Sequence, residues 1–175
     1  AMRRVMKEVH HYPDPYCREL VHAIAAFENV PREFVLCGNG AAELIYAYCE
    51  AIKAKFAVEL SPTFSEYALG LARVGCHVER YVLRQDNDFD LDDGFLPFLM
   101  ERKPEAVFLC NPNNPTGRIL PFDTLEKILE FCHQHHTRLF LDECFLDLSD
   151  ERISMKGYLK AYPELCILKA FTKSY

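Results

Sequence analysis

Short, largely apolar runs alternate with segments of helical periodicity along most of the chain, and this alternation restricts the fold more than any other feature. Apolar strands separated by helices are typical of a parallel sheet that is covered on both faces. The expected strands are residues 34–37, 56–60, 77–83, 106–110, 139–142 and 165–169. The expected helices are residues 41–52, 65–74, a weaker segment after Asp92, and 122–132. The sequence therefore predicts an α/β fold, a three-layer sandwich with a mostly parallel sheet.

The start of the chain predicts a separate helical segment. Asp14 and Pro15 suit the N-cap and the first position of a helix that extends to about Phe27. We expect residues 1–33 to lead into a single large domain over residues 34–175, because no Gly/Ser linker divides the chain. Ala1 stands within a helix-like segment and Tyr175 directly follows a strand and loop, so we also expect the chain to be part of a longer polypeptide.

Charge and hydropathy exclude several classes of partner. The 26 acidic and 20 basic residues give a net charge of −6 without long runs of one sign, which does not favour nucleic acid as a partner. No run approaches the roughly 18 to 20 apolar residues that a membrane-spanning helix needs, and no secretory leader is recognisable. A small-molecule substrate and a cytoplasmic location are the expectations.

The eight cysteines are dispersed and lack a Cys-x-x-Cys spacing, so they predict reduced, mostly buried thiols rather than a disulfide framework. The segment Cys132–His136 resembles a metal-binding cluster in composition. It follows an amphipathic helix, however, and a solvated helix end explains it as well. We therefore expect no metal site.

Five unusual loops follow the predicted strands, where an open parallel sheet binds its ligands. In the first, Gly38, Asn39 and Gly40 precede a helix and offer backbone N–H groups to an anion such as phosphate, although a plain turn also favours glycine. The second places the aromatic ring of Phe64 just past a strand, where it can stack on a planar ligand or pack in the core.

The other three loops supply polar chemistry. Residues 111–117, Asn-Pro-Asn-Asn-Pro-Thr-Gly, combine rigid prolines with amide donors. A strand delivers the carboxylates of Asp142 and Glu143, and Lys173 follows the last strand, although alone it reads as a surface lysine. Together the loops offer an anion cradle, a stacking ring, an amide, a carboxylate and an amine. These groups suit an aldehyde cofactor with a phosphate tail and a pyridine ring.

The Asn-Pro-Asn-Asn-Pro-Thr-Gly string, the strand ending in Asp142-Glu143 and the pair Thr172-Lys173 resemble, in order and spacing, the fold-type-I enzymes of the class I/II aminotransferase family. These enzymes use pyridoxal 5′-phosphate (PLP). The resemblance covers nearly the whole chain and implies the large, cofactor-binding domain of the family, without the small domain that would follow it.

The resemblance also implies roles for individual residues. Lys173 would bind the cofactor aldehyde covalently, with Thr172 beside it, and Asp142 would pair with the ring nitrogen. Asn114 would donate to the ring's phenolic oxygen, and Phe64 would stack on the ring. The phosphate would be held by the backbone of Gly38, Asn39 and Gly40, and Tyr12 would reach the second cofactor of a homodimer.

Two positions depart from the common pattern of the family. Phe145 stands where most members have a tyrosine, and Ala170 stands where many have a serine or threonine. The chain resembles two groups within the family, the decarboxylases of threonine phosphate from cobalamin biosynthesis and the histidinol-phosphate aminotransferases. The first is our preferred expectation because its members share the phenylalanine. The aminotransferase and a non-catalytic PLP-fold binding domain stay open as alternatives.

Overall fold

The computed structural model describes residues 6, 9–149 and 153–173, so the helix-like segment at Ala1 and the end at Tyr175 lie outside the described residues. Its chain divides into two compact units, Ala1–Gly38 and Asn39–Tyr175. The first contains the helix α2 (Arg18–Glu28) and a short 3-10 turn, η1 (Arg32–Phe34). The second contains the whole sheet.

The sheet has five parallel strands in the order β2-β1-β3-β4-β5. Their bounds are β1 (Phe56–Ser61), β2 (His77–Val82), β3 (Ala106–Cys110), β4 (Arg138–Asp142) and β5 (Leu165–Leu168). Each lies within about one residue of the range expected from the apolar runs, within the scatter usual for strand and helix ends. The largely apolar runs predicted a sheet that is buried on both faces, and β3, whose five residues are all buried, lies at its centre.

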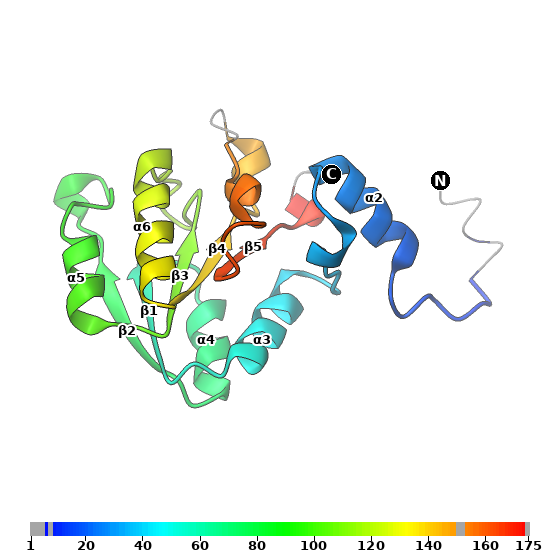
Figure 1. Ribbon diagram of the computed structural model, residues 1–175, viewed down its shortest axis with the longest axis horizontal. Helices are drawn as coiled ribbons and strands as arrows, with labels where there is room; N and C mark the ends of the chain where they lie inside the picture. The colour runs from blue at the N-terminus through cyan, green and yellow to red at the C-terminus, as the bar shows by residue number, and fades with distance from the viewer. Residues whose placement is uncertain (1–5, 7–8, 150–152, 174–175) are drawn as a thin grey trace. The chain divides into compact units, whose positions relative to one another are not determined.

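Two layers of helices cover the sheet (Figure 1). The helices α5 (Phe95–Arg102) and α6 (Phe122–Gln134) pack on one face, against Val107, Leu139 and their neighbours. The helices α3 (Ala41–Ile52) and α4 (Glu66–Arg73) pack on the other, against Phe108, Phe140 and the alternate residues of the same strands. The three-layer α/β sandwich is confirmed.

Residues 34–37 do not form the expected strand. Phe34 ends the turn η1, and Val35 is extended but pairs with no strand among the described residues. The side chain of Leu36 is exposed. An apolar run predicts extended backbone whether or not a partner strand is present. Only hydrogen bonding to a partner turns such a segment into a β-strand.

The first helix begins later than the sequence predicts. Asp14 accepts hydrogen bonds from the backbone N–H groups of Tyr16 at 3.1 Å and Arg18 at 2.9 Å, so it does cap backbone donors. Cys17, however, has a positive φ of 47° and interrupts the helical path, so α2 starts at Arg18. The expected start at Pro15 is wrong, and the expected end near Phe27 is right.

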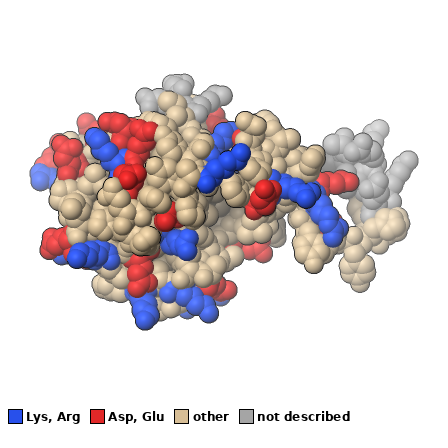
Figure 2. Space-filling view, viewed as in Figure 1, with Lys and Arg blue, Asp and Glu red and all other residues tan. Residues whose placement is uncertain are grey.

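The surface and the cysteines agree with the composition. Figure 2 shows basic and acidic side chains mixed over the face in view, without a large patch of one sign. All eight cysteines are free thiols, as expected. Within the described ranges, no cluster of His, Cys, Asp and Glu is arranged to hold a metal ion, and no helix is long and apolar enough to cross a membrane.

Candidate active site

The last three strands end at the same level, and their following loops therefore lie together. Cys110 pairs with Asp142, and Asp142 pairs with Leu168. The backbone continues this register for one more step, because Asn111 N–H donates to the carbonyl of Asp142 at 2.8 Å and Glu143 N–H donates to that of Leu168 at 2.9 Å. The polar residues singled out in the sequence thus follow one edge of the sheet.

Asp142 faces the α4 side of the sheet, because strand alternation gives it the same face as Phe140. The residue is 4% exposed, and each oxygen of its carboxylate accepts a hydrogen bond. Tyr67 O–H donates to Oδ2 at 2.6 Å, and the backbone N–H of Cys144 donates to Oδ1 at 2.9 Å. Among the described residues, neutral donors rather than a basic side chain bind this buried carboxylate, and they leave lone pairs for a further donor.

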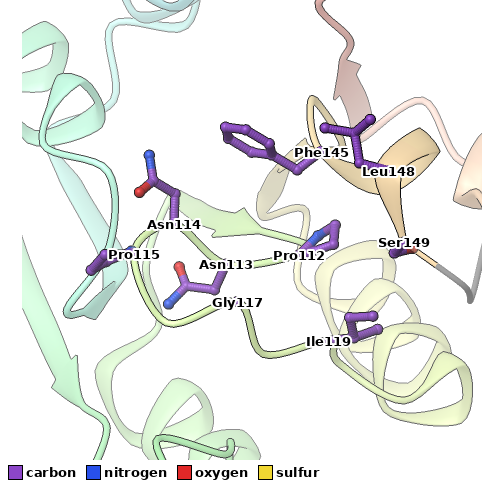
Figure 3. A pocket seen from close by; sticks show the side chains of 9 residues that line it. All are labelled: Pro112, Asn113, Asn114, Pro115, Gly117, Ile119, Phe145, Leu148 and Ser149. Atoms are coloured by element: carbon purple, nitrogen blue, oxygen red, sulfur yellow. The ribbon is translucent and has the colours of Figure 1, made fainter. Parts of the chain in front are cut away.

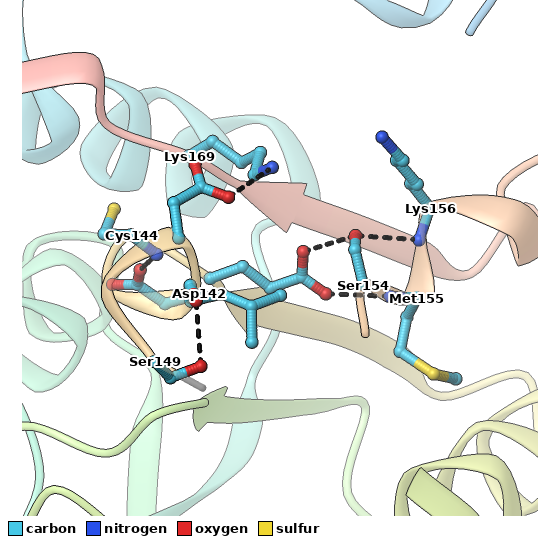
Figure 4. A network of polar contacts seen from close by, with 10 residues as sticks. Asp142, Cys144, Ser149, Ser154, Met155, Lys156 and Lys169 are labelled. Carbon is cyan, nitrogen blue, oxygen red and sulfur yellow. Dashed lines mark hydrogen bonds and ion pairs between the residues drawn. The ribbon is translucent and has the colours of Figure 1, made fainter. Parts of the chain in front are cut away.

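Glu143 points to the opposite side and binds the chain itself. Its carboxylate accepts from Ser154 Oγ at 2.5 Å and from the backbone N–H of Met155 at 2.9 Å, bonds that Figure 4 shows at the labelled Ser154 and Met155. The side chain is buried. Of the two adjacent carboxylates, Glu143 therefore anchors a loop, while Asp142 remains the candidate for ligand chemistry.

The asparagines of the loop after β3 also differ in whether the side chain binds the protein itself or is available to a ligand. Asn111 Oδ1 accepts from Leu120 N–H at 2.8 Å. The amide of Asn113 donates to the carbonyl of Pro62 at 3.0 Å and to Thr116 Oγ1 at 2.9 Å, and accepts from Thr63 Oγ1 at 2.9 Å. These two side chains hold the loop and tie it to the one after β1.

Asn114 has no side-chain hydrogen bond within the part of the chain that the structure describes. Its amide lines a pocket of about 400 Å³ together with Phe145. Figure 3 shows the amides of Asn113 and Asn114 pointing away from each other, with that of Asn114 on the side of Phe145. Asn114 is thus the asparagine of this loop whose donor is available to a ligand.

The loop after β5 carries two lysines in different surroundings. The amine of Lys169 lies 3.6 Å from a carboxylate oxygen of Asp147. Lys173 lies in the 3-10 turn η5 (Phe171–Lys173), and its amine is 5.7 Å from the centre of the Phe145 ring, which itself lines the pocket. Its backbone N–H donates to the carbonyl of Ala170 at 3.3 Å, but its amine makes no hydrogen bond or ion pair among the described residues and is therefore available as a nucleophile at this edge.

The glycine loop opens α3. Gly40 has a φ of 97°, a conformation that favours glycine, and no side chain caps the helix there. The N–H of Asn39 donates to the carboxylate of Glu43, so this expected phosphate donor already has a partner. The remaining N–H groups of the first turn are available to an anion.

Several of the expected site residues belong to the other compact unit or are exposed, and Lys173 is itself exposed. Gly38 and Tyr12 belong to the other compact unit, and the Tyr12 side chain is fully exposed. Thr172 is exposed beside Lys173. The structure thus brings Asp142, Asn114 and Lys173 to one edge of the sheet, and the role of Tyr12 depends on an assembly outside this chain.

The model of the family described as Aminotransferase class I and II matches residues 1–175. The chain belongs to the class I and II aminotransferase family. The enzymes of this family depend on PLP, so the expected family, fold and cofactor are confirmed at the level of the family.

Individual relatives of this aminotransferase-family chain catalyse two reactions. The threonine-phosphate decarboxylase of Salmonella typhimurium is 34% identical over 167 residues, which are 95% of this chain and 46% of that protein. A chloroplastic histidinol-phosphate aminotransferase of Nicotiana plumbaginifolia is 34% identical over 171 residues, 96% of this chain and 40% of that protein. The solved structure of a decarboxylase from Sulfurospirillum multivorans superposes with a TM-score of 0.86 and 29% identity, over 98% of this chain and 44% of that one. The chain spans less than half the length of these relatives.

The residues at the sheet edge fit the cofactor of the aminotransferase family. Asp142 can accept a further hydrogen bond from a ring nitrogen, Asn114 has an unused amide, and Lys173 has an unpaired amine among the described residues. Phe64 follows β1 at the same edge, and its ring packs edge-on against Tyr67 with centroids 5.7 Å apart. An amine, an amide and a carboxylate at one edge match the aldehyde, the phenolic oxygen and the ring nitrogen of PLP.

Sequence reasoning missed two residues of this edge. Tyr67 donates to Asp142, and Asn113 joins the loops after β1 and β3. Tyr67 stands in the buried stripe of α4 with Gly70 and Leu71, and a polar-tipped aromatic residue at the start of such a stripe was the available signal. Burial raises the pKa of the Tyr67 hydroxyl far above its usual value, so the group remains a donor.

Proposed function

We propose that the full-length protein is a PLP-dependent decarboxylase of a phosphorylated amino acid, L-threonine O-phosphate. The observation that carries this choice is Phe145, whose ring lines the pocket with Asn114 and lies 5.7 Å from the amine of Lys173. A phenylalanine offers no hydroxyl to the cofactor's phenolic oxygen. The threonine-phosphate decarboxylase and the decarboxylase structure among the relatives support the same choice.

The proposed roles follow the chemistry of each group. When bound, PLP withdraws electrons from the bond that breaks at the substrate's α-carbon. Lys173 binds the cofactor aldehyde and then moves a proton at that carbon. Asp142 keeps the ring nitrogen protonated, and Asn114 donates to the phenolic oxygen.

Three further contacts complete the proposed cofactor site. Phe64 stacks on the ring. The backbone of Asn39 and Gly40, with Thr172, binds the phosphate. The contact of Asn39 requires its N–H to exchange the Glu43 carboxylate for the phosphate.

A second candidate is an aminotransferase of the histidinol-phosphate type. It is favoured by the Nicotiana relative, which matches this chain at the same 34% identity as the decarboxylase. Both reactions need Lys173 and Asp142. They differ in which α-carbon bond of the substrate stands perpendicular to the cofactor ring, and hence in how the protein turns the substrate.

The two reactions consume different substrates, so one pair of assays separates them. Threonine phosphate supplied alone should release carbon dioxide and leave aminopropanol phosphate. Histidinol phosphate supplied with 2-oxoglutarate should give no glutamate. Rapid glutamate formation without carbon dioxide would establish the aminotransferase instead, and neither product despite bound PLP would favour a non-catalytic binding domain.

Phe145→Tyr tests whether the phenylalanine at this position favours decarboxylation. The new hydroxyl would stand on the ring that lines the pocket with Asn114, and it should slow carbon dioxide release about tenfold, the effect of a misplaced hydrogen bond of about 1.4 kcal/mol. Phe27→Tyr adds a hydroxyl to an exposed ring in the other compact unit and is the matched control. An unchanged decarboxylation rate in Phe145→Tyr would remove the basis for preferring the decarboxylase.

We also propose a homodimer in the cytoplasm. The exposed Tyr12 is available to a second subunit, and the eight free thiols suit a reducing compartment. Light scattering of the full-length protein should give twice the mass of one polypeptide. A fully active monomer would contradict the role of Tyr12.

A further inference from the structure

Tyr67 is a side-chain partner of Asp142 to which the proposed roles assign no function. It lies in the first turn of α4, its side chain is 0% exposed, and its hydroxyl donates to Oδ2 of Asp142 at 2.6 Å. A buried phenol that donates to a buried carboxylate costs desolvation of both groups, so the pair calls for an explanation beyond core packing.

Aromatic neighbours fix the position of the Tyr67 ring. The ring centroid lies 5.7 Å from that of Phe64, 5.9 Å from that of Phe108 and 6.1 Å from that of Phe140. Phe108 and Phe140 belong to the adjacent strands β3 and β4, and Phe64 precedes α4. The ring thus lies between the sheet and the proposed stacking residue, and its hydroxyl is held at one point.

The hydrogen bonds of the carboxylate are divided between its two oxygens. Oδ2 accepts from Tyr67, while Oδ1 accepts from the N–H of Cys144. Burial raises the pKa of Tyr67 far above its usual value, so the phenol stays protonated and able to donate. Two fixed donors on different oxygens define the plane of the carboxylate.

We propose that Tyr67 is a positioning residue for the cofactor ring: its hydroxyl orients the Asp142 carboxylate toward the ring nitrogen, while its ring sets the place of Phe64. This inference rests on the proposed role of Asp142 and does not depend on whether the reaction is decarboxylation or amino transfer. Tyr67 would thereby help to position the bound pyridine both at its ring nitrogen, through Asp142, and at its stacked face, through Phe64.

The test compares two cofactors in the full-length apoprotein. One is PLP, and the other is its analogue in which a C–H group replaces the ring nitrogen. Tyr67→Phe should weaken PLP binding about tenfold, the size expected for a hydrogen bond to a charged group. It should weaken the analogue less than about twofold, because the analogue has no nitrogen for Asp142 to meet.

Tyr46→Phe is the matched control. Tyr46 O–H donates to a carboxylate oxygen of Glu66 at 2.7 Å, so the control removes a phenol-to-carboxylate bond of similar length that does not involve Asp142. Its affinity for both compounds should equal that of the wild type. Thermal unfolding of each apoprotein shows whether the variants are folded.

Each outcome has one meaning. Equal weakening of both compounds in Tyr67→Phe would show that Tyr67 acts through packing alone and would overturn the inference, as would unchanged binding of both. A wild-type protein that binds no PLP would instead overturn the proposed function. If Tyr67→Phe does not fold, replacing Tyr67 by 4-aminophenylalanine retains the ring and a weaker donor. It should reduce the preference for PLP over the analogue about threefold, and an unchanged preference would contradict the inference.

Discussion

Lys169 and Asp147 form an ion pair of 3.6 Å at the start of the segment that ends in Lys173. The two lysines stand on the same short stretch after β5, but only Lys173 lies beside the ring of Phe145. An ammonium group held by a carboxylate is a poor nucleophile, because its charged form is stabilised. The ion pair therefore supports the proposal that Lys173, rather than Lys169, binds the cofactor.

Asp142→Asn tests whether Asp142, rather than the adjacent Glu143, carries the proposed cofactor chemistry. The variant retains an acceptor for the Cys144 N–H but loses the negative charge that would stabilise a protonated ring nitrogen. We expect a folded protein whose turnover is slower by about a hundredfold, or about 3 kcal/mol of barrier. Steady-state rates with saturating PLP measure this, and near-normal turnover would show that the carboxylate is structural.

Glu143→Gln is the matched control for that experiment. Glu143 binds Ser154 and the backbone of Met155, so its loss should lower the free energy of unfolding by about 1–3 kcal/mol. Turnover of the folded fraction should stay within about threefold of the wild type, a barrier change below about 1 kcal/mol.

The neighbouring asparagines should give opposite results when each is replaced by alanine. Asn113→Ala removes the bonds to Pro62, Thr63 and Thr116 and should lower the free energy of unfolding by about 2 kcal/mol. Asn114→Ala should change that quantity by less than about 0.5 kcal/mol but weaken PLP binding about tenfold. Urea unfolding and PLP titration measure the two effects. A reversed pattern would mean that the ligand donor is Asn113.

The fold could be predicted from the sequence because the periodicity of its core is simple. Strands such as 106–110 are apolar throughout, and α3 carries a regular stripe from Ala41 to Ile52, so both were found at nearly their observed bounds. Residues 34–37 have the same apolar character but lack a partner strand, and α2 starts late because of the backbone at Cys17. Pairing and local backbone conformation are not encoded in an apolar pattern.

The site was predicted at the level of loops but not of individual contacts. Prolines, amides and carboxylates after strands marked segments that the structure brings together at one edge of the sheet. The role of each residue depends on the direction in which its side chain leaves the backbone. That direction differs between Asp142 and Glu143 and between Asn113 and Asn114. Tyr67 was missed because its partner is 75 residues away in the sequence.

The buried thiols predict a loss of stability at alkaline pH. Burial raises the pKa of Cys110 from 9.0 to about 11 and that of Cys132 from 9.0 to about 12. The unfolded chain therefore releases these protons from about pH 9, while the folded chain retains them. Each thiol should lower the free energy of unfolding by up to about 1.4 kcal/mol per pH unit above pH 9, and the stabilisation is fully present below that pH.

Urea unfolding under reducing conditions at a series of pH values measures this loss. Cys132→Ala removes one of the titrating thiols, so its stability should fall less steeply above pH 9 than that of the wild type. Equal slopes for the two proteins would contradict the assignment of the alkaline loss to this buried thiol.

The covalent attachment of PLP to Lys173 is the central claim, and borohydride reduction followed by peptide mass mapping tests it most directly. The full-length protein is loaded with PLP, reduced and digested, and the modified lysine is located by mass. We predict a pyridoxyl adduct on Lys173, and no adduct at this edge of the sheet in Lys173→Ala. An adduct on Lys169, or none on either lysine, would contradict the account.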